Sequence, residues 1–349
     1  MSAGVSGLMA RAAASIILSA TAVGHVYAAD AAQSYKAPRN GFGQPVLSGT
    51  WSNETLTRLE RPVEFGDRLI ANQSDLDKLE GTQAKKVQLG NQKTGDTFRE
   101  ECATAAGAFN IQCSYNQAFF DDTLRLMRVN GQPRTSLITS PANGRIPRQP
   151  NAPRPAAFGP GGKADNPEDR SLPDRCLVGQ NYSTGALLNP SIYNNNWVFQ
   201  QNKDTVVIVA EMSHDARIIR IGGQHDNIPR WFGDSIGHWE GDTLVIDTVH
   251  FHPEQLAYNT PALHLKERIT RVGPDRILYQ FTVEDPGVYT QPWSGEYEFA
   301  ASAQPQYEYA CHEGNYALKD ILTGAREEDA RAKATGRPVQ AVASAAEGE

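Results

Sequence analysis

The sequence predicts an all-β protein: a mainly antiparallel meander closed into a lipocalin-like or related barrel, with a C-terminal helix and a long Pro/Gly-rich loop. Short apolar segments recur from residue 197 at roughly ten-residue spacing, as in a meander. Turn sequences separate them, namely NKD at 202–204, EGD at 240–242 and GPD at 273–275. Several segments are apolar on both faces, so the sheet must be covered twice or closed on itself. A closed barrel is the most economical solution.

Residues 1–28 have the features of a secretory signal peptide. Arg11 is the only charge before Asp30, an apolar run follows at 12–23, and Val26-Tyr27-Ala28 precedes the expected cleavage site. This run is too short to span a bilayer, and no later segment reaches 18 consecutive apolar residues. We therefore expect a soluble protein without a membrane span, located in the periplasm or secreted.

The mature chain is expected to form one domain over residues 46–334. Residues 29–45 are polar and predict a flexible arm. Strand-like segments lie at 46–51 and 123–129, with a helical stretch between them at 74–89. The sequence leaves open whether residues 46–140 complete the barrel or form a separate lobe.

Three further segments complete the predicted organisation. Eight of the 21 prolines lie at 141–173, so this segment cannot continue a helix or sheet and predicts a covering loop. Residues 313–334 are rich in helix formers and predict a C-terminal helix, whereas 335–349 are small and polar and predict a disordered tail.

The four cysteines allow three pairings in an oxidising compartment. Cys102 and Cys113 are close in sequence, so we favour this pair, which leaves Cys176 with Cys311. The second disulfide would close a loop of more than a hundred residues and contribute roughly 4 to 5 kcal/mol by loop entropy. Neither pair has CxxC spacing, which disfavours zinc binding and thioredoxin-type chemistry.

Charge and motifs exclude several classes of partner. The formal net charge is −7, and no block of Lys or Arg forms a surface for a phosphate backbone, so we expect no nucleic acid. The sequence contains no nucleotide-binding loop, flavin fingerprint or haem CxxCH motif, so we expect no bound cofactor. A small-molecule substrate or ligand remains the expected partner.

The segment TVVIVAEMSHDARIIR at 205–220 supplies the first candidate site. Strand alternation places Glu211 on the face of Val207 and Val209, where an unpaired carboxylate would be costly. His214 is the predicted general base or acid, with Glu211 or Asp215 orienting it. Arg217 would stabilise a developing oxyanion. The alternative is a structural salt-bridge cluster at the barrel end.

The segment 230–251 supplies predicted substrate contacts. Asp234 and His238 lie among aromatic residues that include Trp231, a surface suited to a flat or cyclic apolar ligand. Trp293 is a further predicted contact. Ser235 is not favoured as a nucleophile, because its Gly-x-Ser-x-Gly context leads into a strand.

The following strand contains Asp247, another carboxylate in an apolar row. His250 and His252 are predicted to share a face of the strand and could supply two ligands of a metal site. Histidines at this spacing are common by chance and no third ligand is evident, so we predict no metal.

The segment 307–318 supplies the last candidates. His312 is predicted to be the second proton-transfer group and to face the same cavity as His214, with Tyr316 as a substrate contact. Glu313 fits an ordinary acid in the first turn of a helix. The mature chain's histidines all lie in a hundred-residue span, which favours a shared pocket: His214, His225, His238, His250, His252, His264 and His312.

These stretches carry a resemblance. EMSHDARII, WFGDSIGHWEGDTLVIDTVHF and YEYACHEGNYAL resemble a family of uncharacterised exported bacterial β-rich proteins, over about residues 48–329. The resemblance includes SLITSPANGRIP, DRCL and YNNNW, and implies that the ionisable residues belong to a shared pattern. It implies no particular reaction. The segments around Cys102 and Cys113 depart from the pattern, which weakens that pairing.

Together these features predict an exported, cofactor-independent enzyme. It would perform acid–base chemistry, as a lyase, isomerase or hydrolase, on a small apolar or cyclic compound in an aromatic-lined barrel pocket. The alternative is a non-catalytic periplasmic binding protein that uses the same charges as anchors. A purely structural protein is disfavoured by the density of ionisable groups. The sequence does not predict the oligomeric state.

Overall fold

A computed structural model describes residues 35–92, 123–152, 164–178, 187–191, 195–256 and 259–336. The expected signal peptide, the Cys102–Cys113 disulfide and the tail beyond residue 336 lie outside these ranges. Within the expected arm, Arg39 forms an isolated β-bridge with Pro45 and an ion pair with Asp242.

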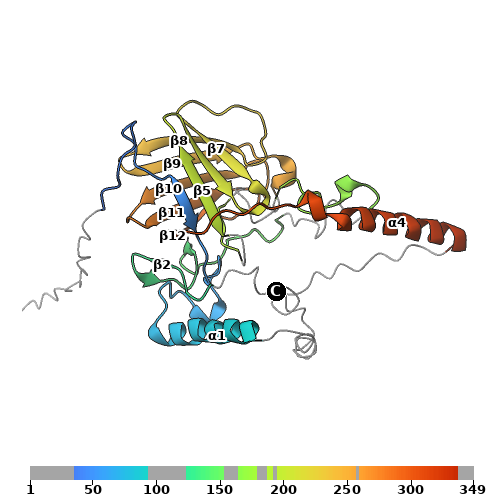
Figure 1. Ribbon diagram of the computed structural model, residues 1–349, viewed down its shortest axis with the longest axis horizontal. Helices are drawn as coiled ribbons and strands as arrows, with labels where there is room; N and C mark the ends of the chain where they lie inside the picture. The colour runs from blue at the N-terminus through green and yellow to red at the C-terminus, as the bar shows by residue number, and fades with distance from the viewer. Residues whose placement is uncertain are drawn as a thin grey trace, which may run out of the picture. The chain divides into compact units, whose positions relative to one another are not determined.

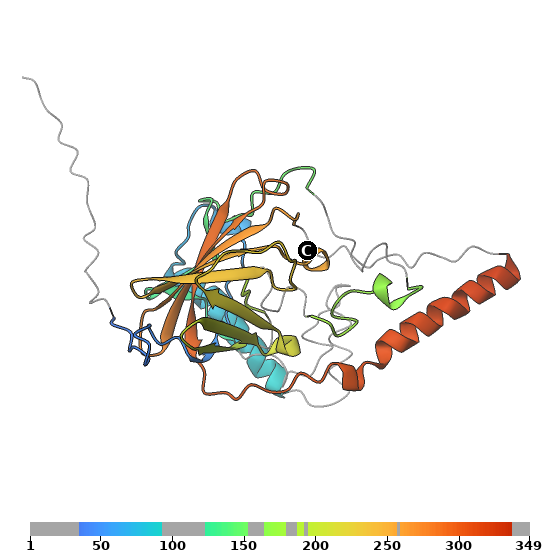
Figure 2. The same ribbon diagram turned by 90° about the horizontal axis from the view of Figure 1, so that it is seen from above.

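Nine strands form a closed barrel (Figure 1), which confirms the predicted fold class. In ring order they are β1 (Gly49–Ser52), β5 (Asn196–Gln201), β6 (Thr205–Ala210), β7 (Ala216–Ile221), β8 (Asp234–Glu240), β9 (Thr243–Val249), β10 (His264–Arg271), β11 (Arg276–Glu284) and β12 (Trp293–Ala301). β12 pairs with β1 and closes the ring, and β4 (Ile138–Ser140) pairs with the same β12. In Figure 2 the orange strands run across the direction of the yellow strands, as in a strongly twisted sheet.

The neighbouring strands of the ring are antiparallel except for one pair. β7 and β8 run parallel, with Ile219 opposite Ser235 and Ile221 opposite Gly237. The predicted meander is therefore interrupted here, and residues 222–233 form a long connection between these two strands. This connection, the β7–β8 loop, positions the candidate site described below.

The remaining described strands and helices lie outside the ring. β2 (Arg128–Val129) and β3 (Gln132–Pro133) form a small hairpin. α1 (Gln73–Gln92) confirms the helix predicted at 74–89, and α4 (Tyr316–Thr335) confirms the C-terminal helix. Asn315 caps α4, because its side chain accepts a hydrogen bond from Leu318 N. No helix in the described ranges is long and apolar enough to cross a membrane.

Large side chains fill the barrel interior. Alternate residues of each strand point inward, as in β6, where Val206, Ile208 and Ala210 are buried. Aromatic rings pack among the aliphatic side chains of the core: the Tyr279 and Tyr297 centroids are 4.9 Å apart, and those of Phe199 and Phe299 5.5 Å apart. Burial of these apolar side chains stabilises the barrel through the hydrophobic effect.

The Pro-rich segment is described on either side of residues 153–163. Before this gap it covers the loop between β11 and β12, because Gln149 N donates to Val288 O and Thr290 N to Pro147 O. After the gap, Cys176 forms the predicted disulfide with Cys311, and the two cysteines are 135 residues apart in sequence. This disulfide joins the segment 164–178 to the start of α4.

Candidate functional site

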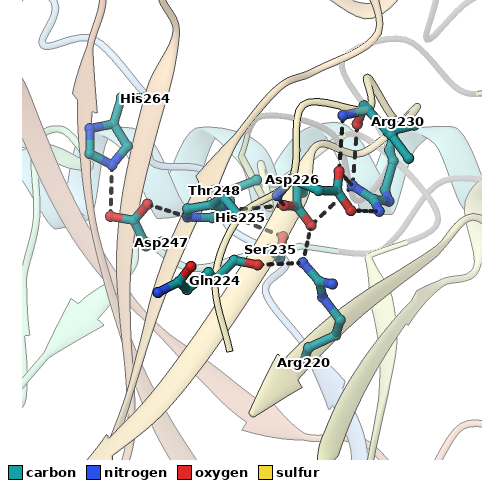
Figure 3. A network of polar contacts seen from close by, with 11 residues as sticks. Arg220, Gln224, His225, Asp226, Arg230, Ser235, Asp247, Thr248 and His264 are labelled. Atoms are coloured by element: carbon teal, nitrogen blue, oxygen red, sulfur yellow. Dashed lines mark hydrogen bonds and ion pairs between the residues drawn. The ribbon is translucent and has the colours of Figure 1, made fainter. Parts of the chain in front are cut away.

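The β7–β8 loop brings a histidine between two carboxylates on the outward face of the barrel (Figure 3). His225 Nδ1 lies 3.1 Å from Asp234 Oδ2, and its Nε2 lies 2.9 Å from Asp247 Oδ1. Asp247 faces outward because its neighbours on β9, Ile246 and Thr248, are buried in the interior. Both bonds form together only when the ring carries two N–H protons, since an ionised carboxylate only accepts.

Asp234 is the residue that fixes the loop to the barrel. Its carboxylate is 2% exposed, at the start of β8. It accepts from Arg220 Nη2 at 2.7 Å and from Asp226 N at 3.0 Å, and forms an ion pair with Arg230 at 3.1 Å. The hydrogen bond from Arg230 also lowers the pKa of Asp226. These donors and charges compensate for the burial of the Asp234 carboxylate.

Asp247 bridges His225 to a second histidine. Its Oδ2 lies 2.7 Å from Nε2 of His264, the first residue of β10. Burial alone would raise the pKa of Asp247, but the hydrogen bonds and charges of His264 and His225 outweigh it and lower the pKa. His264 Nδ1 lies 3.5 Å from Glu284 Oε2. The result is a continuous chain of alternating carboxylates and imidazoles.

Two further histidines, His250 and His252, follow the end of β9. His250 follows β9 with a left-handed backbone (φ 53°), and its ring centroid lies 6.4 Å from that of His225, edge to face. His250 Nδ1 is buried and has no hydrogen-bond partner. The ring of His252 lies instead against Trp231, with centroids 4.0 Å apart and a 31° tilt.

The prediction that His250 and His252 share a strand face is wrong. Strand alternation ends at Val249, because the positive φ of His250 turns the chain, and the two rings have different neighbours. In the described ranges, no group of three or more His, Cys, Asp or Glu is arranged to hold a metal ion.

The predicted site at the end of β6 attaches residues 302–311 to the barrel. The chain leaves extended geometry at Glu211 (φ −63°, ψ −41°), so Glu211 does not continue the row of Val207 and Val209, and that prediction is wrong. Its buried carboxylate accepts from Asn196 Nδ2 at 3.0 Å and from Tyr307 N at 3.2 Å. These two amide groups supply the hydrogen-bond donors that the buried Glu211 carboxylate needs.

His214 performs a similar task. Its Nε2 accepts from Tyr309 N at 3.0 Å, so Glu211 and His214 together attach residues 302–311 to the barrel. His312, in the exposed turn His312–Gly314, follows on the same segment. The partner of His214 is therefore the backbone of Tyr309, and no hydrogen bond of the described residues joins His214 to His312.

Arg217 and Asp215 are both buried. Arg217 is buried in the barrel, where it pairs with Glu267, and Tyr279 donates to the same carboxylate at 2.7 Å. Asp215 is buried, and its backbone carbonyl accepts from Ala210 N. Of the four predicted residues, Glu211 and His214 thus hold the segment 302–311, and Arg217 lies in the barrel interior.

The predicted substrate contacts are also distributed. Trp231 and Asp234 belong to the β7–β8 loop and its anchor. Trp293 is buried in the core, with its ring edge-on to Phe281 and Tyr289. His238 and Tyr316 are exposed, the former beside Glu240. Ser235 points into the barrel and shares a hydrogen bond with Thr248, which fits its rejection as a nucleophile.

The sequence predicts no individual role for His225, His264, Arg220 or Arg230. The loop sequence GGQHDNIPRWFG at 222–233 has no periodicity from which side-chain direction could be predicted. Only the clustering of histidines in one span, and a carboxylate at Asp247 in an otherwise apolar strand, pointed toward this place.

Comparison of the chain with protein-family models finds no family that matches. Comparison with curated proteins finds no significant match either.

Proposed function

We propose that this protein is an exported enzyme that performs acid–base chemistry, as a lyase, isomerase or hydrolase, on a small apolar or cyclic organic compound. The site we favour is the histidine network at the β7–β8 loop, which consists of Asp234, His225, Asp247 and His264. The observation that carries this proposal is the carboxylate of Asp247, which joins two part-exposed imidazoles: the side chains of His225 and His264 are 27% and 28% exposed. Solvent and substrate can reach proton-exchanging groups held in this way.

The surroundings support a flat substrate. The Trp231 ring packs against His252 and provides an amphipathic aromatic surface on the same β7–β8 loop that carries His225. The Cys176–Cys311 disulfide supports an oxidising compartment and thus export. These features agree with a neutral or weakly acidic cyclic compound better than with a highly charged one, because Asp234 is already paired with Arg220 and Arg230 and Asp226 with Arg230.

A non-catalytic binding protein is the second candidate. It is favoured by the double bonding of His225, since a ring with both nitrogens bonded to carboxylates suits a fixed anchor. The two proposals differ in whether a proton is transferred repeatedly, and turnover therefore separates them.

The ring opening of 5-nitrobenzisoxazole tests the enzyme proposal, because this flat probe needs only removal of one proton by a base. We expect catalysis by the native protein above that by the unfolded chain, and a fall of about 100-fold for Asp247→Asn. Asp275→Asn, at an exposed turn carboxylate, should retain the native rate. Equal rates for native and unfolded protein would contradict the enzyme proposal and leave ligand binding as the function to examine.

A further inference from the structure

We propose that His264 is the general base of this site and that its Nδ1 atom accepts a proton directly from the substrate. This inference rests on the proposed function and assigns the proton-accepting atom within it. His264 is the first residue of β10, and Figure 3 shows it at the end of the network, beyond Asp247. Three features support the role: access from solvent, an unused lone pair and a carboxylate that fixes the ring.

The His264 ring lies on the outward face of the barrel. Along β10 the side chains of Leu265 and Glu267 are buried in the interior, so those of His264 and Lys266 point outward. The side chain of His264 is 28% exposed, and its neighbours Asp247 and Lys266 are 41% and 49% exposed. A substrate can therefore contact this ring from solvent without entering the packed core.

The hydrogen bond to Asp247 determines which nitrogen of His264 carries the proton. Nε2 lies 2.7 Å from Asp247 Oδ2, and an ionised carboxylate only accepts, so Nε2 is the donor. In a neutral imidazole the other nitrogen, Nδ1, then has a lone pair. This lone pair is the feature that a general base requires.

The nearest acidic group to Nδ1 leaves that lone pair unused. The distance from His264 Nδ1 to Glu284 Oε2 is 3.5 Å, longer than a hydrogen bond, and no hydrogen bond within the described ranges reaches Nδ1. Lys266 Nζ donates to Glu284 Oε1 at 2.8 Å and holds the carboxylate in place. When Nδ1 takes up a proton, this carboxylate faces the new positive charge and favours the transfer.

The neighbouring histidines lack this combination. Both nitrogens of His225 are engaged by carboxylates, at 3.1 Å from Asp234 and 2.9 Å from Asp247. A ring nitrogen that donates to a carboxylate has no lone pair to offer, so His225 would first have to break a bond of the network. His250 Nδ1 has no partner but is buried. Of these three rings, only that of His264 combines exposure with an unused nitrogen.

Strand pairing holds the proposed base between its two carboxylates. β10 lies between β9 and β11, with Lys266 opposite Asp247 and His264 opposite Glu284. The three side chains that contact one another, those of Asp247, His264 and Glu284, thus project from three neighbouring strands of one sheet. Backbone hydrogen bonds fix these strands, which reduces the cost of orienting the base.

The chemistry defines the class of substrate. Imidazole is a base of moderate strength, so the substrate is a flat ring compound whose C–H bond is activated by an electron-withdrawing group. The C–H bond breaks, its proton moves to Nδ1 of His264, and its electron pair stays on the substrate, where it forms a new π bond. The imidazolium later returns the proton to the product or to water. In 5-nitrobenzisoxazole the electron pair completes a nitrile while the N–O bond breaks to give a phenolate.

The first test replaces His264 by glutamine and uses 5-nitrobenzisoxazole. The glutamine amide can still donate to Asp247 but has no basic nitrogen, so the unfolding temperature should stay native. We expect His264→Gln to lower kcat about 100-fold with KM nearly unchanged. His225→Gln should lower the rate by about 10-fold or less, because it removes hydrogen bonds but no proton acceptor. Asp275→Asn should retain the native rate.

The outcomes separate the inference from the function on which it rests. A native rate in His264→Gln, together with a slow Asp247→Asn, would overturn the role of His264 and leave the proposed function standing. A larger fall in His225→Gln than in His264→Gln would also overturn it. Failure of the native protein to open the probe would instead contradict the proposed function itself.

A second measurement needs no variant. Diethyl pyrocarbonate acylates imidazole nitrogens that are accessible and carry a lone pair, and mass spectrometry locates the modified histidines. We expect His264 in the native protein to react faster than His225 and more slowly than His238, which is 61% exposed. Loss of activity should follow the modification of His264. An unmodified His264 after His238 has reacted completely would overturn the inference even if His264→Gln failed to fold.

Discussion

Arg217 on β7 pairs with Glu267 on β10 in the barrel interior, and both side chains are at most 1% exposed. Their strands are not neighbours, since β8 and β9 lie between them in the ring. The ion pair therefore links separate parts of the barrel wall through the core. Tyr279 donates a second hydrogen bond to the same carboxylate.

Neutralising Glu267 should unfold the barrel more readily. Glu267→Gln removes the negative charge that pairs with the buried Arg217 guanidinium, and we expect a loss of about 3–5 kcal/mol in the free energy of unfolding. Urea titration measures this loss. Glu240→Gln, which removes a pair exposed at 46% and 49%, should cost less than about 1 kcal/mol. A similar small cost at Glu267 would show that the barrel does not depend on this ion pair.

Stability should also decline at alkaline pH. Burial raises the pKa of Tyr279 and of Tyr297 well above the ordinary value. A raised pKa in the folded state stabilises the fold below about pH 10, the unfolded value, and this contribution is lost as pH rises further. We expect Tyr279→Phe to reduce the decline measured by urea unfolding across this range. An identical alkaline decline in the variant would exclude Tyr279 as a cause.

At acid pH the sign is reversed for Asp247. Its folded pKa is lowered, so its contribution is present above about pH 3.9, the unfolded value, and is lost as pH falls through the lower folded value. Asp247→Asn should remove this part of the acid dependence of unfolding. Parallel curves for variant and native protein between pH 5 and about pH 2 would contradict the assignment.

The attachment of residues 302–311 can be measured at one amide. Tyr309 N donates to His214 Nε2, so His214→Phe should speed hydrogen exchange at this amide, by about 5-fold for a bond of about 1 kcal/mol. His312→Phe, on the same segment but exposed, is the matched control. Unchanged exchange in His214→Phe would show that other contacts hold the segment.

Repeated local patterns account for what the sequence predicts well. The spacing of WVFQQ, TVVIVAEM and the later segments predicts the strands, because each buries alternate residues such as Val206 and Ile208. The pairing of Cys176 with Cys311 followed from the proximity of the other two cysteines. Ring closure was expected only in general terms, since nothing in LSGTW specifies pairing with β5, which begins more than 140 residues later.

The candidate site was harder to predict because it depends on backbone turns that leave no periodic pattern. Alternation placed Glu211 on a strand face, but Ser213 and His214 adopt positive φ and the strand has already ended. His225 has neighbours that are 9 and 22 residues away in sequence, and only the folded loop brings them together. Side-chain partners across such distances require the three-dimensional path of the chain.

The number of strands in the ring has a consequence for the site. Direction alternates around a fully antiparallel ring only if the count is even, and this ring has nine strands. One neighbouring pair must therefore run the same way, and that pair is β7 and β8. Consecutive parallel strands cannot be joined by a tight turn, because the chain must first travel back along the strand. The parity of the barrel thus requires the returning segment that contains His225 and Trp231, and a ring with one strand fewer would have no geometric need for it.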